Sequence, residues 1–244
     1  MNIIEKLYYQ MLGLHIRSSS KTNKLKVEKK LKCKKVSIKV IGNNNSIHLG
    51  YNFSGYKSRI NVTGSNNKIV IGDGFNNSGK VVVSIIGNNN KVLLGKNITV
   101  ISGLNIYNHE NGKNCNIIIG DNSSFYKTEI HNYDYDSSVK IGNDCMFSYD
   151  TVIYNTDGHA IVQNGKIINK ATELVIGDHV WVGWGCTILK NSYVSNNCIC
   201  GRAALVCGKF SESNCAIAGV PAKIIKRNVN WSRKSVNEYL ETAF

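Results

Sequence analysis

Apolar residues recur every six positions through the second half of the chain. Small or branched apolar side chains stand six residues apart at Ile176, Val182, Ile188, Val194, Cys200 and Val206. An amphipathic helix needs apolar positions three and four residues apart, and hairpin strands need turn dipeptides between alternating runs, so neither template fits. A period of six is one signature of a parallel β-helix, in which stacked coils form hydrogen bonds strand to strand. The pattern therefore predicts a solenoid.

The corners of this solenoid are visible in the first half of the chain. Three tetrapeptides rich in glycine and asparagine begin 22 and then 23 residues apart, at Gly42, Gly64 and Gly87. Both residue types adopt left-handed backbone angles at little steric cost, so they suit repeated tight corners. A short apolar strand ending in glycine follows each corner, and such glycines recur at Gly50, Gly72, Gly95, Gly120, Gly142 and Gly177. One coil is therefore about twenty residues, or three faces of six with loop extensions.

The last interval in this series is too long. Gly142 and Gly177 are 35 residues apart, whereas the earlier intervals are 22 to 25 residues. We therefore expect an insertion at 154–172 to leave the solenoid, and such insertions commonly become binding or catalytic loops. The insertion contains His159 close to Asp157 and a glycine, where flexible backbone can direct an imidazole outward. His159 is the candidate catalytic residue, and Asp157 is a candidate for orienting its ring.

Two segments flank the repeat. Residues 1–35 begin with an amphipathic pattern that predicts a short helix, and residues 17–39 contain ten Lys or Arg and a single Glu. We expect the helix to cap the open first coil. The alternatives are contact of residues 1–39 with the inner membrane surface, and a solvated basic linker. Residues 36–226 are expected to form the β-helix domain, and residues 227–244 a second cap.

Composition narrows the function classes. The chain has 244 residues, which one solenoid domain accounts for, and its net charge is +14. Its basic segment can bind an anionic membrane, an acidic polymer or nucleic acid by charge alone. We expect no nucleic-acid partner. Eight cysteines show no CxxC pair and no zinc-ligand spacing, so we expect reduced thiols packed between coils and no metal. No apolar run approaches the roughly 18 residues of a membrane span, and we see no secretory signal, so a cytoplasmic protein is expected.

The last coils contain two longer motifs. They are I-G-D-H-V-W-V-G-W-G, which begins at Ile176, and A-G-V-P-A-K-I-I-K, which begins at Ala218. Together they resemble the hexapeptide-repeat acyltransferases, most closely the polysaccharide O-acetyltransferase branch, over roughly residues 114 to 231. The resemblance implies a left-handed β-helix, so the expected fold class is all-β, a left-handed parallel β-helix solenoid with the short helical caps expected at its two ends. It also implies a homotrimer with active sites between subunits and acetyl-CoA as the donor. The handedness comes from the resemblance alone, because parallel connections are generally right-handed.

The same resemblance assigns roles around the reacting carbonyl. His159 matches the general base that the family carries in a T-x-x-H or D-x-H loop. The backbone N–H of Trp184 matches the group that faces the thioester carbonyl in relatives. Trp181, Gly183 and Trp184 are the candidates for the oxyanion site and acceptor wall. The two indole rings alternatively pack at the seam between subunits.

The resemblance also places the coenzyme. Small residues let a ligand approach the backbone closely, and basic residues near the end of the second motif match a cluster that meets the coenzyme phosphates. Lys209 is shifted by one residue from the lysine of the family's V-V-T-K-D motif. The alternative for the basic cluster is an ordinary charged surface. The candidates are Gly185, Ala203, Ala204, Lys209, Pro221, Lys223 and Lys226.

The function that these features imply is O-acetylation of a sugar hydroxyl in a bacterial surface polysaccharide, such as a capsule or O-antigen, with an acidic polymer suiting the basic chain. An acetyl thioester is already activated, so the chemistry needs a base for the hydroxyl proton and donors for the oxyanion. One alternative is N-acetylation of an amino sugar. Another is a zinc hydratase of the same fold, whose three ligands would be His131, His159 and His179.

Overall fold

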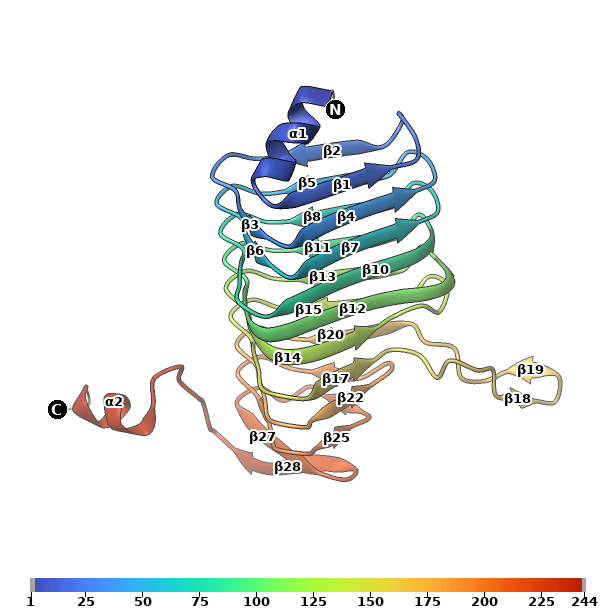
Figure 1. The fold of residues 1–244 in the computed structure, drawn as a ribbon. Helices are drawn as coiled ribbons and strands as arrows, with labels where there is room; N and C mark the ends of the chain where they lie inside the picture. Colours follow the sequence, from blue (N-terminus) through green and yellow to red (C-terminus); the bar gives the residue numbers. More distant parts are fainter. Residues whose placement is uncertain (1–2, 243–244) are drawn as a thin grey trace.

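The computed structural model describes residues 3–242, which form a parallel β-helix with a short α-helix at each end (Figure 1). The chain coils left-handedly around one axis, and successive coils add strands to three faces. This arrangement confirms the fold class expected from the sequence. No helix among the described residues is both long and apolar enough to span a membrane.

Each face is a ladder of parallel strands. The first face consists of β1 (Leu14–Ser18), β4 (Val36–Ile41), β7 (Ser58–Thr63), β10 (Lys80–Asn88), the later parts of β12 (Thr99–Lys113) and β14 (Ser124–His131), β17 (Thr151–Tyr154), β22 (Thr187–Leu189) and β25 (Leu205–Val206). The second face consists of β2 (Lys24–Val27), β5 (Ser46–Leu49), β8 (Lys68–Ile71), β11 (Lys91–Leu94), β13 (Asn116–Ile119), β15 (Ser138–Ile141), β20 (Glu173–Ile176), β23 (Tyr193–Val194) and β26 (Lys209–Phe210). The third face consists of β3 (Lys32–Lys34), β6 (Ser54–Tyr56), β9 (Asn76–Asn77), the beginnings of β12 and β14, β16 (Met146–Phe147), β21 (Trp181–Val182), β24 (Ile199–Cys200), β27 (Cys215–Gly219) and its antiparallel partner β28 (Ala222–Arg227).

Three corners join these faces. The loop corner leads from the first face to the second and carries residues 155–172. The tail corner leads from the second face to the third and carries His179, where the C-terminal tail crosses it. The tryptophan corner leads from the third face to the first and carries Trp184.

The core is built from side chains of equivalent coil positions stacked along the axis. Strand residues alternate between buried and outward positions, as in β4, where Val36, Ile38 and Val40 point inward. The aromatic rings of Phe53 and Phe75 stack with their centroids 5.2 Å apart. Because strands of neighbouring coils lie about 4.8 Å apart, like residues at like positions stack directly on one another in the interior.

A ladder of asparagines lies inside the loop corner of the first coils. Asn45 donates from Nδ2 to Oδ1 of Asn23 at 3.1 Å, and Asn67 donates in the same way to Asn45 at 3.0 Å. The Oδ1 atom of Asn67 accepts from the backbone N–H of Asn90 at 3.0 Å. Asn45, Asn67 and Asn90 are almost completely buried. Buried amides need partners, and each coil supplies the partners of the next.

Gly64 illustrates why the corners need glycine. Its φ is +123°, and a Cβ atom built there would lie 1.9 Å from the carbonyl oxygen of Gly87 in the next coil. We expect Gly64→Ala to lower the free energy of unfolding by about 3 kcal/mol, because strained backbone alone costs roughly 1–3 kcal/mol. Gly165→Ala is the matched control, since Gly165 also has positive φ (+73°) but nothing within 4 Å of the added Cβ. Equal urea midpoints for the two variants would contradict this prediction.

The eight cysteines are all unpaired, and six of them are buried. Burial raises the pKa of the Cys145 thiol to about 12, so this side chain stays a neutral packing group. The thiols of Cys115 and Cys198 donate to backbone carbonyls within the corners. These positions agree with the expectation of reduced cysteines packed between coils.

The solenoid begins one coil earlier than the expected boundary at residue 36. β1 pairs in parallel with β4 from Leu14 onwards, and β2 and β3 pair with β5 and β6. The lysines of β2 alternate with Leu25 and Val27, which pack against the core. Outward positions on a solenoid strand can hold any polar residue. The basic stretch therefore looks like a disordered charged segment in the sequence, although it forms the first turn of the solenoid.

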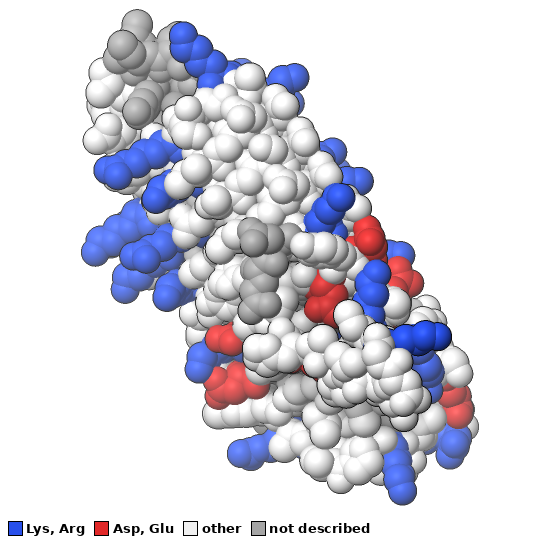
Figure 2. All heavy atoms as spheres, turned by 90° about the vertical axis from the view of Figure 1, so that its right-hand side faces the viewer, with Lys and Arg blue, Asp and Glu red and all other residues white. Residues whose placement is uncertain are grey.

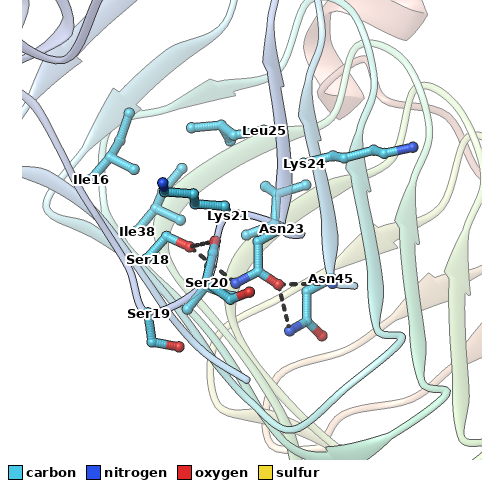
Figure 3. Close-up of a pocket in the computed structure, with 12 residues that line it drawn as sticks. Ile16, Ser18, Ser19, Ser20, Lys21, Asn23, Lys24, Leu25, Ile38 and Asn45 are labelled. Carbon is cyan, nitrogen blue, oxygen red and sulfur yellow. Dashed lines mark hydrogen bonds between the residues drawn. The ribbon is translucent and has the colours of Figure 1, made fainter. Parts of the chain in front are cut away.

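The expected N-terminal helix is present as α1 (Ile3–Met11), which contacts β1. Of its described side chains, Tyr9 packs against the core, whereas Leu7, Tyr8 and Met11 are exposed. The interior of the first coil is open as a hollow of about 510 Å³, in which Ile16, Leu25 and Ile38 face Asn23 and Asn45 (Figure 3). The helix therefore covers the end of the solenoid only in part, and Leu7, Tyr8 and Met11 are directed to solvent.

The C-terminal tail crosses the tail corner before it leaves the solenoid. The indole of Trp231 stacks on the His179 ring at 4.2 Å and donates to the His179 carbonyl oxygen at 2.8 Å. Arg233 donates from Nε to Asp144 at 2.8 Å, and Asp144 also lies 2.7 Å from Nδ1 of His179. Burial opposes ionisation of Asp144, but the hydrogen bonds from Arg233 and His179 outweigh it and lower its pKa. α2 (Val236–Glu241) then projects away and buries no side chain (Figure 1).

Candidate active site

The chain leaves the solenoid between Tyr154 and Glu173, where the break in the coil period predicts an insertion. Within it, β18 (Val162–Gln163) and β19 (Lys166–Ile167) form an antiparallel hairpin that projects far from the solenoid (Figure 1). Asn164 and Gly165 connect them with φ values of +50° and +73°. An Asn-Gly pair suits this turn because both central residues need positive φ.

Asp134 fastens both ends of the insertion to the solenoid. Its Oδ1 atom accepts from the Thr156 hydroxyl at 2.6 Å, and its Oδ2 atom accepts from the backbone N–H of Ala171 at 2.9 Å. Thr156 and Ala171 are both buried. One carboxylate thus satisfies a donor on each strand of the loop base and fixes where the loop departs.

Asn169 closes the loop above this base. Its Nδ2 group donates to the His159 carbonyl oxygen at 2.8 Å and to Oδ2 of Asp157 at 2.7 Å. Its Oδ1 atom accepts from the backbone N–H of Ile161 at 2.8 Å. Since these bonds are made on both sides of His159, Asn169 sets the backbone conformation at that residue.

Asp157 is engaged by groups other than the His159 ring. Lys190, from the following coil, forms a salt bridge with Oδ2 of Asp157. The Lys190 ammonium and then the Asn169 amide lower the pKa of the Asp157 carboxyl. In this structure these contacts of Asp157 hold the loop, and its role in orienting the imidazole stays a prediction.

His159 opens onto a hollow of about 430 Å³ at the loop corner. The imidazole is exposed, so an incoming hydroxyl can reach it. A Cβ atom built on Gly158 would lie 4.0 Å from each of the Tyr133 and Tyr154 hydroxyl oxygens, which lie 3.2 Å from each other. The hollow is lined by Asp134, Tyr135, Asp157, Gly158, His159, Ala160, Ile167, Asn169 and Lys170.

The tryptophan corner carries a separate apolar hollow of about 490 Å³. The Trp184 ring is half exposed and lies 5.3 Å from the Tyr149 ring, with the Arg202 guanidinium 5.5 Å from its centroid. Trp181 donates from its indole nitrogen to Ser148 at 3.2 Å. The structure thus brings the three expected wall residues together in one hollow, which is lined by Tyr126, Met146, Ser148, Tyr149, Trp181, Gly183, Trp184, Ile199, Cys200, Gly201 and Arg202.

The backbone of this corner has an open donor position. Gly183 and Gly185 donate their N–H groups to the carbonyls of Cys200 and Tyr149. Within the described part of the chain, the Trp184 N–H between them has no carbonyl partner. Ala203 donates to the Trp184 carbonyl at 2.8 Å, which places this small residue at the rim, whereas Ala204 is buried beneath it.

The basic coenzyme candidates lie on two different faces. Lys223 and Lys226 are exposed on β28 of the third face, close to Pro221. Lys209 is exposed on β26 of the second face. The structure therefore separates Lys209 from the other two lysines, which share the third face with Trp181.

The two hollows share no lining residue and lie at different corners of the solenoid. His159 lies on the insertion that follows the first-face strand β17, whereas Trp184 precedes the first-face strand β22 of the next coil. One copy of the chain therefore does not place the imidazole against the Trp184 N–H.

Comparison with known proteins decides the family. No family model matches the chain. A polysialic acid O-acetyltransferase of Neisseria meningitidis is 32% identical to it over 197 residues, which cover 80% of this chain and 79% of that protein. The chain belongs to the hexapeptide-repeat acyltransferases, in the polysaccharide O-acetyltransferase branch. The resemblance inferred from the two motifs is thereby confirmed.

One further relative and one solved structure are similar to this chain. A polysialic acid O-acetyltransferase of Escherichia coli O1:K1 is 38% identical over 105 residues, which cover 42% of this chain and about a third (34%) of that relative. The crystal structure of NeuO, a polySia-specific acetyltransferase, matches with a TM-score of 0.66 and 23% identity, over 95% of this chain and 99% of that one. The second match shows a shared fold.

The three histidines considered as zinc ligands occupy different places in this acyltransferase. His131 is on β14 of the first face, His159 is on the insertion, and His179 is held at the tail corner by Asp144 and Trp231. Among the residues described, no group of three or more His, Cys, Asp or Glu could hold a metal ion.

The residues that position the acyltransferase loop were missed in the sequence. Asp134 and Lys190 reach the loop from other coils, and Asn169 closes it from within, at sequence separations of up to 37 residues from their partners. Only the coil period carries a signal for Asp134, because it lies about one coil before Thr156 and turns at the same corner. Asn169 and Lys190 give no pattern that separates them from other polar residues.

Proposed function

We propose that this acyltransferase transfers an acetyl group from acetyl-CoA to a sugar hydroxyl of a capsular polysaccharide. The observation that carries the proposal is the exposed His159 in a fastened insertion loop of a chain related over most of its length to a polysialic acid O-acetyltransferase. An acidic acceptor of that class suits the net charge of +14.

His159 is proposed as the general base. A neutral imidazole accepts the hydroxyl proton as the sugar oxygen attacks the thioester carbonyl, and it returns the proton to the departing thiolate. No covalent enzyme intermediate is required, because the thioester is already activated. The open N–H of Trp184 is proposed as a donor to the carbonyl oxygen as it becomes negative, an interaction typically worth about 3 kcal/mol.

The donor is proposed to lie along the tryptophan corner and the third face. Gly185 has open space around its Cα, and Ala203 projects only a methyl group at the rim, so a pantetheine arm can approach the backbone there. Lys223 and Lys226, beyond Pro221, are the proposed phosphate partners. Lys209 lies on the second face. It is proposed to contact only a coenzyme that is bound to a neighbouring subunit.

A homotrimer with active sites between subunits is proposed. The proposal is supported by the distance between the two hollows, which lie at different corners of one chain. In a trimer, the Trp184 hollow of a neighbouring copy can lie against His159. The projecting hairpin also exposes Ile161, Val162, Ile167 and Ile168, which is unfavourable in an isolated chain.

A cytoplasmic location at the inner membrane is also proposed, because the N-terminal helix exposes apolar side chains. Leu7, Tyr8 and Met11 of α1 face solvent, and the neighbouring first coil is rich in lysine. An apolar helix face beside basic residues is the arrangement that binds anionic membrane surfaces.

The test is acetyl-CoA turnover, followed by thiol release, with polysialic acid, a neutral dextran or no acceptor. We expect release that depends on the acidic polymer, with acetyl groups that mild alkali removes from the product, as expected for an ester. Acetyl groups that resist alkali would show N-acetylation instead. Intact acetyl-CoA with every acceptor, together with no binding of coenzyme A, would overturn the proposed function.

A further inference from the structure

A hollow on the first face gathers three cations. It has a volume of about 540 Å³ where β1, β4 and β7 run side by side, with Gln10 of α1 at its edge. Arg17, Lys39 and Arg59 line it, and none of them forms a salt bridge within the described residues. We call it the basic hollow. In Figure 2 the first face lies along the left edge, where Lys and Arg side chains gather in the upper half.

This basic hollow suits an anion. No carboxylate is among its lining residues, which apart from the three cations are polar or aliphatic, with His15 and Asn61 on its walls. Positive charge that is not neutralised within the protein attracts negative charge from solution, and a concave surface concentrates the field. The cations come from three successive coils, so an extended anion can meet them in sequence.

Strand register connects the basic hollow to the catalytic loop. Arg17 and Lys39 begin a column of outward residues that continues through the polar side chains of the next two strands to aromatic rings. Neighbouring strands are about 4.8 Å apart, so the five steps from Arg17 to His131 cover roughly 24 Å. In order, the column consists of Arg17, Lys39, Asn61, Ser84, Tyr107, His131 and Tyr154.

The column ends in a wall of rings beside the loop. The Tyr107 and Tyr154 rings each lie 5.0 Å from the His131 ring. Tyr154 is the last residue before the insertion, and its hydroxyl packs near Gly158, which precedes His159. Such rings offer an apolar face with a polar edge, which matches the apolar faces and peripheral hydroxyls of sugar rings.

A second column of outward residues runs beside the first and contains Arg59, Asn105 and Glu129. Glu129 is the single carboxylate in these two columns. One of its carboxylate oxygens lies 3.4 Å from Nε2 of His131, and the other accepts from the Asn105 amide at 3.4 Å. It stands three strand steps from Arg59 in the same register. The negative charge is therefore placed near the reacting end and away from the basic hollow.

We propose that the first face is an acceptor track, on which a polyanionic glycan lies along the solenoid with its carboxylates at Arg17, Lys39 and Arg59. The chain then passes the polar column and presents a sugar against Tyr107, His131 and Tyr154, next to His159. This inference rests on the proposed function, since it concerns the acceptor of that reaction. It adds that the basic hollow, which binds the polymer, lies several coils away from the sugar that reacts.

The test compares a polymer with a short acceptor. The triple variant Arg17→Ala, Lys39→Ala, Arg59→Ala removes the basic hollow without touching His159 or the aromatic wall. We expect KM for polysialic acid to rise about tenfold or more, the lower end of the effect of electrostatic attraction on encounter. The value of kcat and both constants for a sialic acid dimer should stay at the level of the native chain. Added NaCl should raise KM for the polymer in the native chain more than in the variant.

The matched control is Lys24→Ala, Lys68→Ala, Lys91→Ala, which removes the same charge from outward positions of the second face. An equal rise in KM for both triple variants would overturn the track, because the loss of net charge would then account for the effect. An unchanged KM for the polymer, or an equal loss with the dimer, would overturn it as well.

Two binding measurements distinguish a glycan track from a lipid site. Fluorescence anisotropy of labelled polysialic acid, without donor, tests binding to the basic hollow even if no transfer is detected, so failure of the proposed function is distinguishable from failure of the track. Vesicles of phosphatidylglycerol test a membrane surface instead. Loss of vesicle binding in the first triple variant, with polymer binding unchanged, would assign the cations to lipid and overturn the proposal.

Discussion

Replacing His159 with alanine is expected to lower kcat/KM for acetyl transfer by about 10²–10⁴, the usual contribution of a general base. The side chain is exposed on a loop, so its removal leaves no cavity in the core. Thermal unfolding should therefore occur at the same temperature as in the native chain. The rate is measured by thiol release over a series of polymer concentrations, which gives kcat and KM, together with direct binding of coenzyme A.

The control for this variant is His48→Ala. His48 is a half-exposed histidine on the second face, where its Nε2 atom lies 3.3 Å from Glu28. It should retain native turnover. If the His159 variant also retained native turnover, the base would have to lie elsewhere, and the proposed mechanism would be wrong even if the acceptor were correct.

Replacing Asp134 with alanine is expected to lower kcat/KM by about 10² while the solenoid stays folded. Thr156 and the buried N–H of Ala171 would lose their acceptor, and an unsatisfied buried donor costs about 1–3 kcal/mol. The loop base then shifts, and a displacement of about 1 Å at a reacting group is enough for a loss of this size. Limited proteolysis should cut the insertion faster than in the native chain.

Asp134→Asn tests whether position rather than charge matters. An asparagine can accept from the Ala171 N–H through Oδ1 and donate to the Thr156 hydroxyl through Nδ2. It should therefore restore most of the activity and the protease resistance. Asp136→Ala, on the same turn but exposed, is the second control. A loss as large in the asparagine variant as in the alanine variant would show that Asp134 acts through its charge.

The repeat could be predicted from the sequence because every coil meets the same backbone problem. Gly64 sits where the next coil's carbonyl leaves no room for a side chain, and the neighbouring Asn66 has φ of +59°. A requirement imposed at each coil produces a periodic choice of residue, and a period is visible without any homologue. The insertion was visible for the same reason, as a break in the period.

The site could be predicted only in part because its contacts do not repeat. His159 was identified by its place on the insertion, and the tryptophan corner by resemblance to a family motif. Asp157 was assigned a role toward His159 since the two are neighbours in sequence, yet Lys190 of the next coil reaches it. The first coil could not be recognised in the sequence because its outward positions hold lysines. Packing does not restrict which residue stands at an outward position.

The coil period has a consequence for how such an enzyme changes its reach. A whole coil of about 22 residues added before β10 would leave the loop, both hollows and every corner as they are. It would lengthen the first face by one strand spacing, about 4.8 Å. On the proposed acceptor track, each coil gained or lost would therefore change the distance between the basic hollow and His159 by one strand spacing.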